Sequence, residues 1–189
     1  MIPVKYLNAA RQFAAIKDAR TYLQGVYVDH DRIVGCDGAI CGVFRLPEPV
    51  PFKVLLPNML LDRLKIPKQI TTVDLSVEDS AIPGYKRVTI SYSGTQVTEE
   101  VDGPYYPDYR GVIPKSVTGE TAQFDINLLN RINKAAEALH GKSETSHVRI
   151  AHNGQGPALI HLADENFTGC IMPLRDQDVP CEAPAWVFE

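Results

Sequence analysis

The sequence contains no long apolar run. None of its 189 residues belongs to a stretch approaching the ~20 consecutive apolar residues that a membrane-spanning helix requires. The N-terminus also lacks the basic segment, apolar core and small-residue cleavage site of a secretory signal. We therefore expect a cytoplasmic protein that contacts no membrane.

Cysteine is also scarce, with four residues in the chain: Cys36, Cys41, Cys170 and Cys181. Four thiols do not make a dense disulfide framework. Cys36 and Cys41 are spaced too widely for a zinc knuckle, and no second close pair completes four ligands, so we predict no metal site. Asp37 beside Cys36 would raise the pKa of the thiol, and Asp37-Gly38 is typical of a tight turn. A turn between strands is therefore favoured over a nucleophile.

Catalytic signatures are missing from the sequence. It has no phosphate-binding loop, no nucleophile elbow, no paired metal-binding histidines and no dinucleotide fingerprint. Lys and Arg number 19 against 23 Asp and Glu, so the bulk charge does not indicate a polycation that binds nucleic acid. We expect a protein that is not an enzyme and that needs no cofactor.

The acidic excess is confined to the C-terminal end. Residues 176–189 hold four acids and no Lys or Arg, so the rest of the chain is balanced at 19 against 19. Two predicted helices with their exits are locally positive, through Lys5, Arg11, Lys17 and Arg20 in one and Arg131, Lys134 and Lys142 in the other. Such faces either follow a phosphate backbone or are ordinary solvated faces balanced by acidic loops. The charge pattern alone leaves both interpretations open.

One pattern occurs three times along the chain. The first copy begins with an amphipathic helix at Val4–Lys17. Two runs rich in β-forming residues and interrupted by glycines follow at Tyr22–Asp29 and Arg32–Phe44, and a proline-rich stretch ends the copy. The second copy predicts a strand at Phe52–Leu56, a helix to Leu64, and strands at Thr72–Glu78, Lys86–Tyr92 and Thr95–Val101. The third predicts a helix at Phe124–Leu139 and strands at His147–His152, Ala158–Leu162 and Phe167–Met172.

The second and third copies can be aligned, because residues 60–64 (LLDRL) of one fall on residues 128–132 (LLNRI) of the other. This is an internal repeat. We predict an α+β fold made of three strand-helix-strands units, with antiparallel sheets and one helix per unit lying on a sheet face.

Four segments, in order along the chain, carry a family resemblance: DARTYLQG at 18–25, CDG at 36–38, VDGPYYPDYRGVIPK at 101–115 and IMPLR at 171–175. They resemble segments of the bacterial DNA polymerase III beta subunit, the sliding clamp. The first three are similar to the clamp's middle domain, which we place at 1–117. The fourth is similar to the C-terminal half of its last domain, which we place at 118–175, and residues 176–189 form an acidic tail.

The resemblance implies a DNA-clamp fold that encircles duplex DNA as a ring, with helices inside and sheets outside. It also implies a pocket that tethers a DNA polymerase or other clamp-binding peptides. Neither role is catalysis. The pocket positions that the resemblance carries over are Leu23, Cys36, Gly38, Pro107, Val112, Ile171, Met172, Pro173, Leu174 and Arg175. Where the family usually has a basic pair and Leu after Gly38, this chain has Ala39, Ile40 and Cys41, so we expect a more apolar pocket.

The predicted DNA-facing residues combine basic positions on the first and third helices with Tyr22, which matches a DNA-facing loop of the family: Lys5, Arg11, Lys17, Arg20, Tyr22, Arg131 and Lys134. The resemblance covers three of the six units of a clamp subunit. Four copies, a homotetramer, would match the twelve units of the family ring if the third unit finds a complementary half on a neighbour. An unpaired third unit would expose a sheet edge and an apolar helix face.

Two alternatives remain beside the ring. The first is a clamp-derived adaptor or decoy that forms no ring and binds clamp-interacting proteins or the full-length clamp. The second, which is much weaker, is a cysteine-dependent enzyme. The acidic tail adds a separate question, because Trp186 and Phe188 either dock in the pocket and compete with partners or cap a core.

Overall fold

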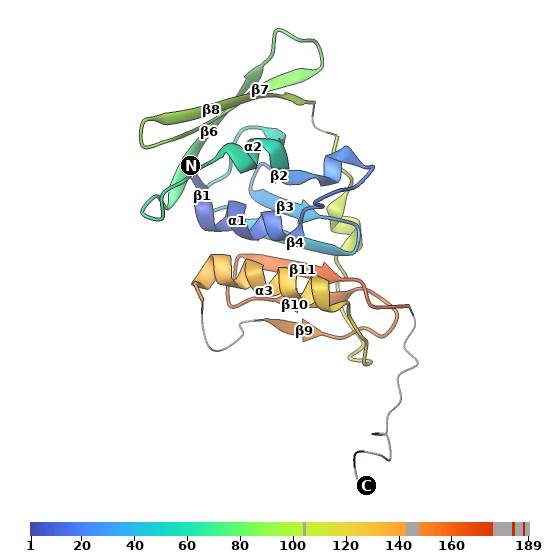
Figure 1. Ribbon diagram of the computed structural model, residues 1–189. Helices are drawn as coiled ribbons and strands as arrows, with labels where there is room; N and C mark the ends of the chain where they lie inside the picture. Colours follow the sequence, from blue (N-terminus) through green and yellow to red (C-terminus); the bar gives the residue numbers. More distant parts are fainter. Residues whose placement is uncertain (104, 143–147, 176–182, 184–186, 188–189) are drawn as a thin grey trace.

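The fold is described from a computed structural model, for residues 1–103, 105–142, 148–175, 183 and 187. Within these residues, three α-helices lie on two antiparallel sheets (Figure 1). One sheet has the strand order β5-β2-β3-β4-β11-β10-β9 and the other the order β1-β6-β7-β8. The predicted α+β class is confirmed. The predicted docking of Trp186 and Phe188 lies outside the described residues.

Unit one consists of β1 (Ile2–Pro3), α1 (Val4–Phe13), the 3-10 turn η1 (Thr21–Leu23), β2 (Gly25–Asp29), β3 (Arg32–Cys36) and β4 (Ile40–Arg45). α1 ends before the predicted Lys17 because Ala14 is extended and Ala15 donates its N–H to the Leu23 carbonyl oxygen at 2.9 Å. The predicted run Arg32–Phe44 is a hairpin of two strands. The short β1 was not predicted, because two residues carry no periodicity.

Unit two matches the predicted pattern, with β5 (Lys53–Pro57), α2 (Asn58–Arg63), β6 (Thr72–Asp79), β7 (Tyr85–Tyr92) and β8 (Thr95–Asp102). A second 3-10 turn, η2 (Tyr109–Val112), follows it. Unit three consists of α3 (Ile126–His140), β9 (Arg149–Ala151), β10 (Ala158–His161) and β11 (Phe167–Ile171). Asp125 caps α3 by accepting the Asn127 N–H at 2.7 Å, and Gly141 ends it with φ of 79°. The described residues just before α3 form no strand, unlike those before α1 and α2.

The units are joined through their sheets. β1 of unit one pairs with β6 of unit two, and β5 of unit two pairs with β2 of unit one, so these two units exchange opening strands. β4 pairs with β11 from Phe44↔Phe167 to Ile40↔Ile171, which makes units one and three share one sheet. α1 and α3 lie side by side over that sheet (Figure 1).

The core lies between the helices and the sheets. Phe13 of α1 is fully buried and its ring lies 6.2 Å from that of Phe44 and 5.7 Å from that of Phe167, so aromatic contacts connect the helix to both sheet halves. Gly42 lets this happen, because a Cβ there would lie 2.5 Å from the Phe13 ring. None of the helices in the described part of the chain is long and apolar enough to span a membrane.

Candidate functional site

Three segments that are distant in the sequence meet on the outer side of the seven-stranded sheet, the side away from the helices: residues 36–41, 106–113 and 170–172. A fourth segment, residues 18–23, reaches the β3–β4 turn through Arg20. In the sheet, Cys36 lies opposite Cys41, which in turn lies opposite Cys170. Just after β11, the N–H of Met172 donates to the Ala39 carbonyl oxygen at 2.7 Å. The end of unit three is therefore fixed directly beside the β3–β4 turn.

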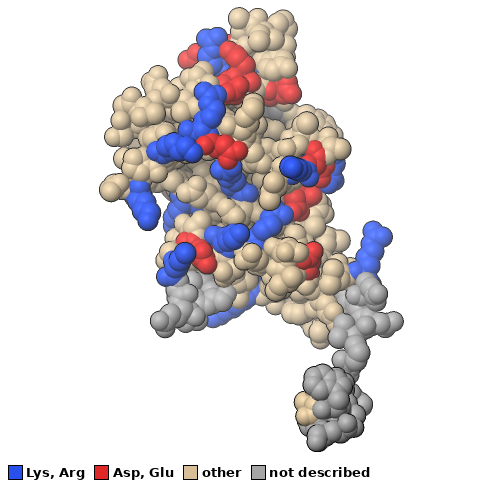
Figure 2. All heavy atoms as spheres, in the orientation of Figure 1, with Lys and Arg blue, Asp and Glu red and all other residues tan. Residues whose placement is uncertain are grey.

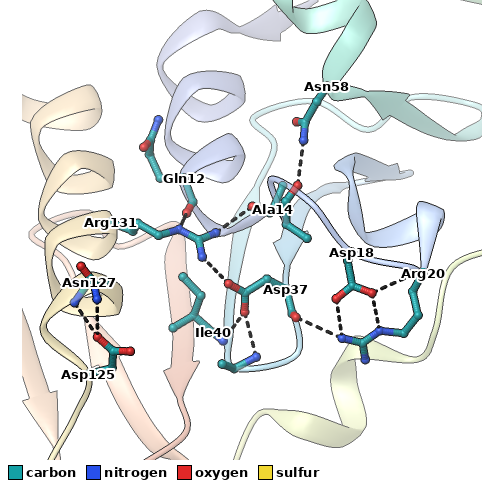
Figure 3. Close-up of polar contacts among 12 residues, drawn as sticks. Gln12, Ala14, Asp18, Arg20, Asp37, Ile40, Asn58, Asp125, Asn127 and Arg131 are labelled. Atoms are coloured by element: carbon teal, nitrogen blue, oxygen red, sulfur yellow. Dashed lines mark hydrogen bonds and ion pairs between the residues drawn. The ribbon is translucent and has the colours of Figure 1, made fainter.

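Asp37 organises the β3–β4 turn (Figure 3). Its Oδ1 accepts the backbone N–H groups of Ala39 at 2.8 Å and Ile40 at 2.9 Å. Gly38 has φ of 95°, where a side chain would be strained, and a Cβ there would lie 2.9 Å from the guanidinium of Arg20. The predicted tight turn at Asp37-Gly38 is confirmed. Because glycine has no side chain, the turn leaves room for the Arg20 guanidinium.

Arg131 of α3 connects three parts of the chain (Figure 3). Its guanidinium forms an ion pair with the Asp37 carboxylate and donates to the carbonyl oxygens of Gln12 at 2.8 Å and Ala14 at 2.7 Å. These carbonyls belong to the end of α1, where helical acceptors lack intrahelical donors. The Arg131 side chain is only 19% exposed. These contacts argue against the predicted DNA contact of Arg131 and give it a structural role instead.

Arg20 lies directly before the 3-10 turn η1 and Tyr22 lies within it, between α1 and β2. The Arg20 guanidinium donates to the Asp18 carboxylate at 2.8 and 2.9 Å and to the Asp37 carbonyl oxygen at 3.3 Å. The hydrogen bonds from Arg20 lower the pKa of Asp18 to about 2. The Tyr22 ring packs edge-on against Tyr105 with centroids 5.5 Å apart. The predicted DNA contacts of Arg20 and Tyr22 stay predictions, and these contacts give them no support.

A segment after β8 covers the outer side of the sheet. Tyr106 stacks on Tyr27 with ring centroids 4.4 Å apart and planes 6° from parallel. The Tyr109 hydroxyl donates to Asp29 Oδ2 at 2.8 Å, and Arg110 Nη2 donates to the same oxygen at 2.6 Å. Asp29 is thus the anchor that holds this segment, and with it Pro107 and Val112, against β2.

Asp29 is buried in a strand that is otherwise apolar, with 2% of its surface exposed. Burial alone would raise its pKa, but hydrogen bonds from Lys53, Tyr109 and Arg110 outweigh it and hold the pKa at about 2. Lys53 Nζ lies 3.0 Å from Asp29 Oδ1. Sequence reasoning missed this network, although a carboxylate at the end of a buried β-run was the signal that could have indicated it.

The three described thiols on the outer side differ in the direction in which their pKa values are shifted. A hydrogen bond shared between Cys36 and Cys41 lowers the pKa of Cys36 and raises that of Cys41. Burial raises the pKa of Cys170 to about 12. Within the described residues, no group of three or more His, Cys, Asp or Glu side chains is arranged to hold a metal ion.

The ten predicted pocket residues fall into two groups. Met172 and Leu174 are each 42% exposed, and Val112 is 47% exposed, so these apolar side chains present surface to solvent. Leu23 is 2% exposed and Ile171 is fully buried, so these two lie beneath the surface. The five others range from half-buried to exposed: Cys36, Gly38, Pro107, Pro173 and Arg175.

Ile171 requires a correction as a surface contact. Its side chain belongs to the helix-side core together with Ile40, its partner across the β4–β11 ladder. Side chains alternate between the faces of a strand, so Ile171 points away from the outer side on which Cys170 lies.

The face that carries the helices holds several of the predicted DNA-facing cations. Figure 2 shows Lys and Arg side chains spread over this face with acidic side chains among them. Lys17 and Lys134 are exposed. Lys5 lies 3.3 Å from Asp164, and Arg11 forms an ion pair with Asp62 across α1 and α2. Arg11 and Lys134 line one hollow between the helices.

Comparisons with known proteins identify the fold. The DNA polymerase III subunit beta of Pseudomonas aeruginosa has a similar structure, with a TM-score of 0.65, 16% identity, and 90% of this chain and 63% of that one covered. The subunit beta of Borrelia burgdorferi, solved in complex with a natural product, has a TM-score of 0.64 at 16% identity, with 90% and 61% covered. The beta chain of Streptococcus pneumoniae has a TM-score of 0.62 at 16% identity, with 93% and 65% covered.

The chain therefore has the sliding-clamp fold, and the resemblance that the sequence motifs indicated is confirmed at the level of fold. It spans less than two thirds of the length of each of these proteins. No protein-family model and no curated protein matches the sequence.

Proposed function

We propose that this chain is a sliding-clamp-like scaffold, which encircles duplex DNA as a homo-oligomer and holds a DNA polymerase or other replication and repair proteins through a peptide pocket. The role is binding, without catalysis and without a cofactor. The observation that carries the proposal is the convergence of four distant segments beside the β3–β4 turn, in a chain with the clamp fold.

The surface beside the turn suits an extended apolar peptide. Met172, Leu174 and Val112 offer apolar surface, and Gly38 leaves the β3–β4 turn without a side chain next to the Arg20 guanidinium. Methionine is flexible and polarisable, so it adapts to varied anchors. An apolar surface of this composition binds a peptide by burying a few of its apolar side chains, and Arg175, which follows Leu174, is exposed.

The helix face would contact the phosphate backbone without reading bases. We propose Lys17 and Lys134 as primary contacts because both are exposed. We propose Lys5 and Arg11 as further contacts. In each of their ion pairs at least one side chain is exposed, and exposed ion pairs are weak enough for the cation to bind a phosphate instead.

A titration with a fluorescent clamp-binding peptide tests the pocket. Wild-type protein is expected to bind, whereas Met172→Asp is expected to lose binding because a carboxylate in an apolar groove is costly to desolvate. Ile82→Asp is the matched control, because Ile82 is 50% exposed in the β6–β7 loop of unit two. Equal affinities for the wild type and Met172→Asp would place the pocket elsewhere.

A further inference from the structure

Three cysteines lie in a row across the outer side of the seven-stranded sheet. Cys36 of β3 lies opposite Cys41 of β4, and Cys41 lies opposite Cys170 of β11. All three are free thiols, and they pack in the apolar cluster of that side together with the Tyr106 ring. Directly opposite residues of neighbouring strands point to the same face of a sheet. Each thiol of the row therefore faces the same side as its neighbour on the next strand.

The backbone hydrogen bonds show which of the two pairs is the closer one. At the turn end of the β3–β4 ladder, the Asp37 N–H donates to the Ile40 carbonyl oxygen at 3.1 Å. Pairs with and without hydrogen bonds alternate along an antiparallel ladder, so the next pair, Cys36 with Cys41, is a non-hydrogen-bonded pair. Side chains lie closest together in such pairs, and a disulfide needs Cβ atoms about 3.8 Å apart. The Cys36–Cys41 pair is therefore the type that a disulfide fits.

Cys41 and Cys170 form a pair of the other type. On the β4–β11 ladder, the Met172 N–H donates to the Ala39 carbonyl oxygen at 2.7 Å. The Cys41–Cys170 pair lies two positions further along the same ladder, so the alternation makes it a hydrogen-bonded pair. Side chains are further apart in such pairs, whose Cα atoms are separated by about 5.5 Å rather than about 4.5 Å. Of the two neighbouring pairs, Cys36–Cys41 is thus favoured for a bond between the sulfurs.

The two thiols of this pair differ in access and in charge. Cys36, at the end of β3, is half-buried, whereas Cys41 is 1% exposed. A hydrogen bond from the Cys41 thiol is the largest cause of the lowered pKa of Cys36. The Gly38 N–H and the Arg20 guanidinium lower this pKa further, while burial and Asp37 oppose them. An accessible thiolate beside a second thiol is typical of cysteines that peroxides oxidise reversibly.

We propose that Cys36 and Cys41 form a reversible oxidation site for hydrogen peroxide. The Cys36 thiolate attacks one peroxide oxygen, the O–O bond breaks, and a sulfenic acid forms while hydroxide leaves and takes up the proton that Cys36 gave to solvent. The Cys41 sulfur then displaces hydroxide from the Cys36 sulfur, and the Cys41 proton converts this hydroxide into water. The peroxide gains two electrons, the two sulfurs together lose two, and a thiol reductant reverses the change.

This site goes beyond the proposed function. It depends on the register of β3 and β4 and on the access to Cys36, so it holds whether or not the chain binds DNA or a peptide. Cys36 is also one of the predicted pocket residues, and it directly precedes the Asp37-Gly38 turn. The disulfide would therefore form at the surface that is proposed to bind peptides.

Peptide mapping of the oxidised full chain tests the site. Cleavage after Lys and Arg places Cys36 and Cys41 together on residues 33–45, Cys170 on 150–175 and Cys181 on 176–189. After dilute hydrogen peroxide and blocking of the remaining thiols, folded wild type is expected to yield residues 33–45 as a single peptide lighter by two hydrogens. Dithiothreitol should restore its mass. Unmodified thiols, or a main product that links 33–45 to another peptide, would overturn the inference.

Alanine variants test the separate roles of the thiols, each made together with Cys181→Ser because Cys181 lies outside the described residues. In Cys41→Ala the sulfenic acid of Cys36 has lost the opposite thiol, so dimedone is expected to trap it. Cys36→Ala is expected to give neither an adduct nor a disulfide. Cys170→Ala, the matched control, removes a buried thiol of the same row and should keep the disulfide. An adduct on Cys41 in Cys36→Ala, or no disulfide in Cys170→Ala, would contradict these roles.

The thermal midpoint keeps the test decisive if a variant does not fold, because it needs only the wild type. A disulfide that fits the register leaves the fold undistorted and constrains the unfolded chain. Protein whose map shows this disulfide as its only modification is therefore expected to unfold at the same temperature as the reduced protein or higher. A lower midpoint would show that the bond forms only when β3 and β4 are distorted, and would overturn the inference.

Discussion

Removing the Asp29 carboxylate is expected to loosen the segment that covers the outer side of the sheet. In Asp29→Asn the charge partner of Lys53 and Arg110 is lost, and the Tyr109 hydroxyl loses its carboxylate acceptor. The pKa of Asp29 lies at about 2 against an ordinary value of 3.8. At 1.36 kcal/mol per pKa unit, this difference corresponds to about 2 kcal/mol of stability at neutral pH.

The pH dependence follows from the sign of the shift. The pKa of Asp29 is lowered in the folded protein, so its contribution is fully present above pH 3.8 and is lost as the pH falls through about 2. Urea unfolding followed by circular dichroism, repeated between pH 7 and pH 2, measures it. The free energy of unfolding of Asp29→Asn should lie about 2 kcal/mol below that of wild type at pH 7, and the difference should shrink below pH 4.

Asp79→Asn is the matched control. Asp79 also pairs with a lysine, Lys86, but its side chain is 88% exposed, so the same substitution is expected to change the free energy of unfolding very little. A difference between wild type and Asp29→Asn that is the same at pH 2 and pH 7 would refute the role assigned to the ionised carboxylate. No difference at pH 7 would refute the anchor itself.

Three further changes test other contacts. Arg131→Met removes the link from α3 to Asp37 and is expected to lower the free energy of unfolding by about 2–3 kcal/mol, measured with urea, and a loss under about 0.5 kcal/mol would contradict its structural role. Met172→Asp is expected to weaken peptide binding at least tenfold in a fluorescence titration without shifting the thermal midpoint, and retained affinity would misplace the pocket. Lys17→Glu combined with Lys134→Glu should reduce the slope of log affinity for DNA against log salt by about 0.9 for each phosphate that is no longer neutralised, and an unaltered slope would show that this helix face does not meet DNA.

The sequence indicated most of the elements because their signals are local. Alternating β-formers bounded by turns located β6, β7 and β8 to within a residue or two at each end, and Asp37-Gly38 located the β3–β4 turn. The predicted end of α1 at Lys17 was wrong, since what stops the helix at Phe13 is a hydrogen bond from Ala15 to the distant Leu23. The strand exchange between units one and two was not predicted, because β1 is very short and its partner β6 begins only at Thr72.

The sequence predicted which segments form the candidate site better than it predicted what each residue does there. The resemblance named segments that the fold does bring together, including Met172 beside Ala39. The charge pattern could not predict that the Arg131 guanidinium is engaged by Asp37 and by two carbonyl oxygens at the end of α1. These contacts join residues that lie far apart in the sequence. For the same reason Ile171 was assigned to a surface although its side chain lies in the core, since strand alternation shows two faces but not which one is covered.

The central claim is that copies of this chain close around duplex DNA, and retention on DNA of defined topology tests it most directly. Protein assembled on closed circular DNA should stay bound at high salt, where phosphate contacts are weakened, and should be released when the same DNA is cut once. Equal retention on circular and linear DNA would show backbone binding without encirclement. Failure to remain on circular DNA at high salt would contradict the clamp role altogether.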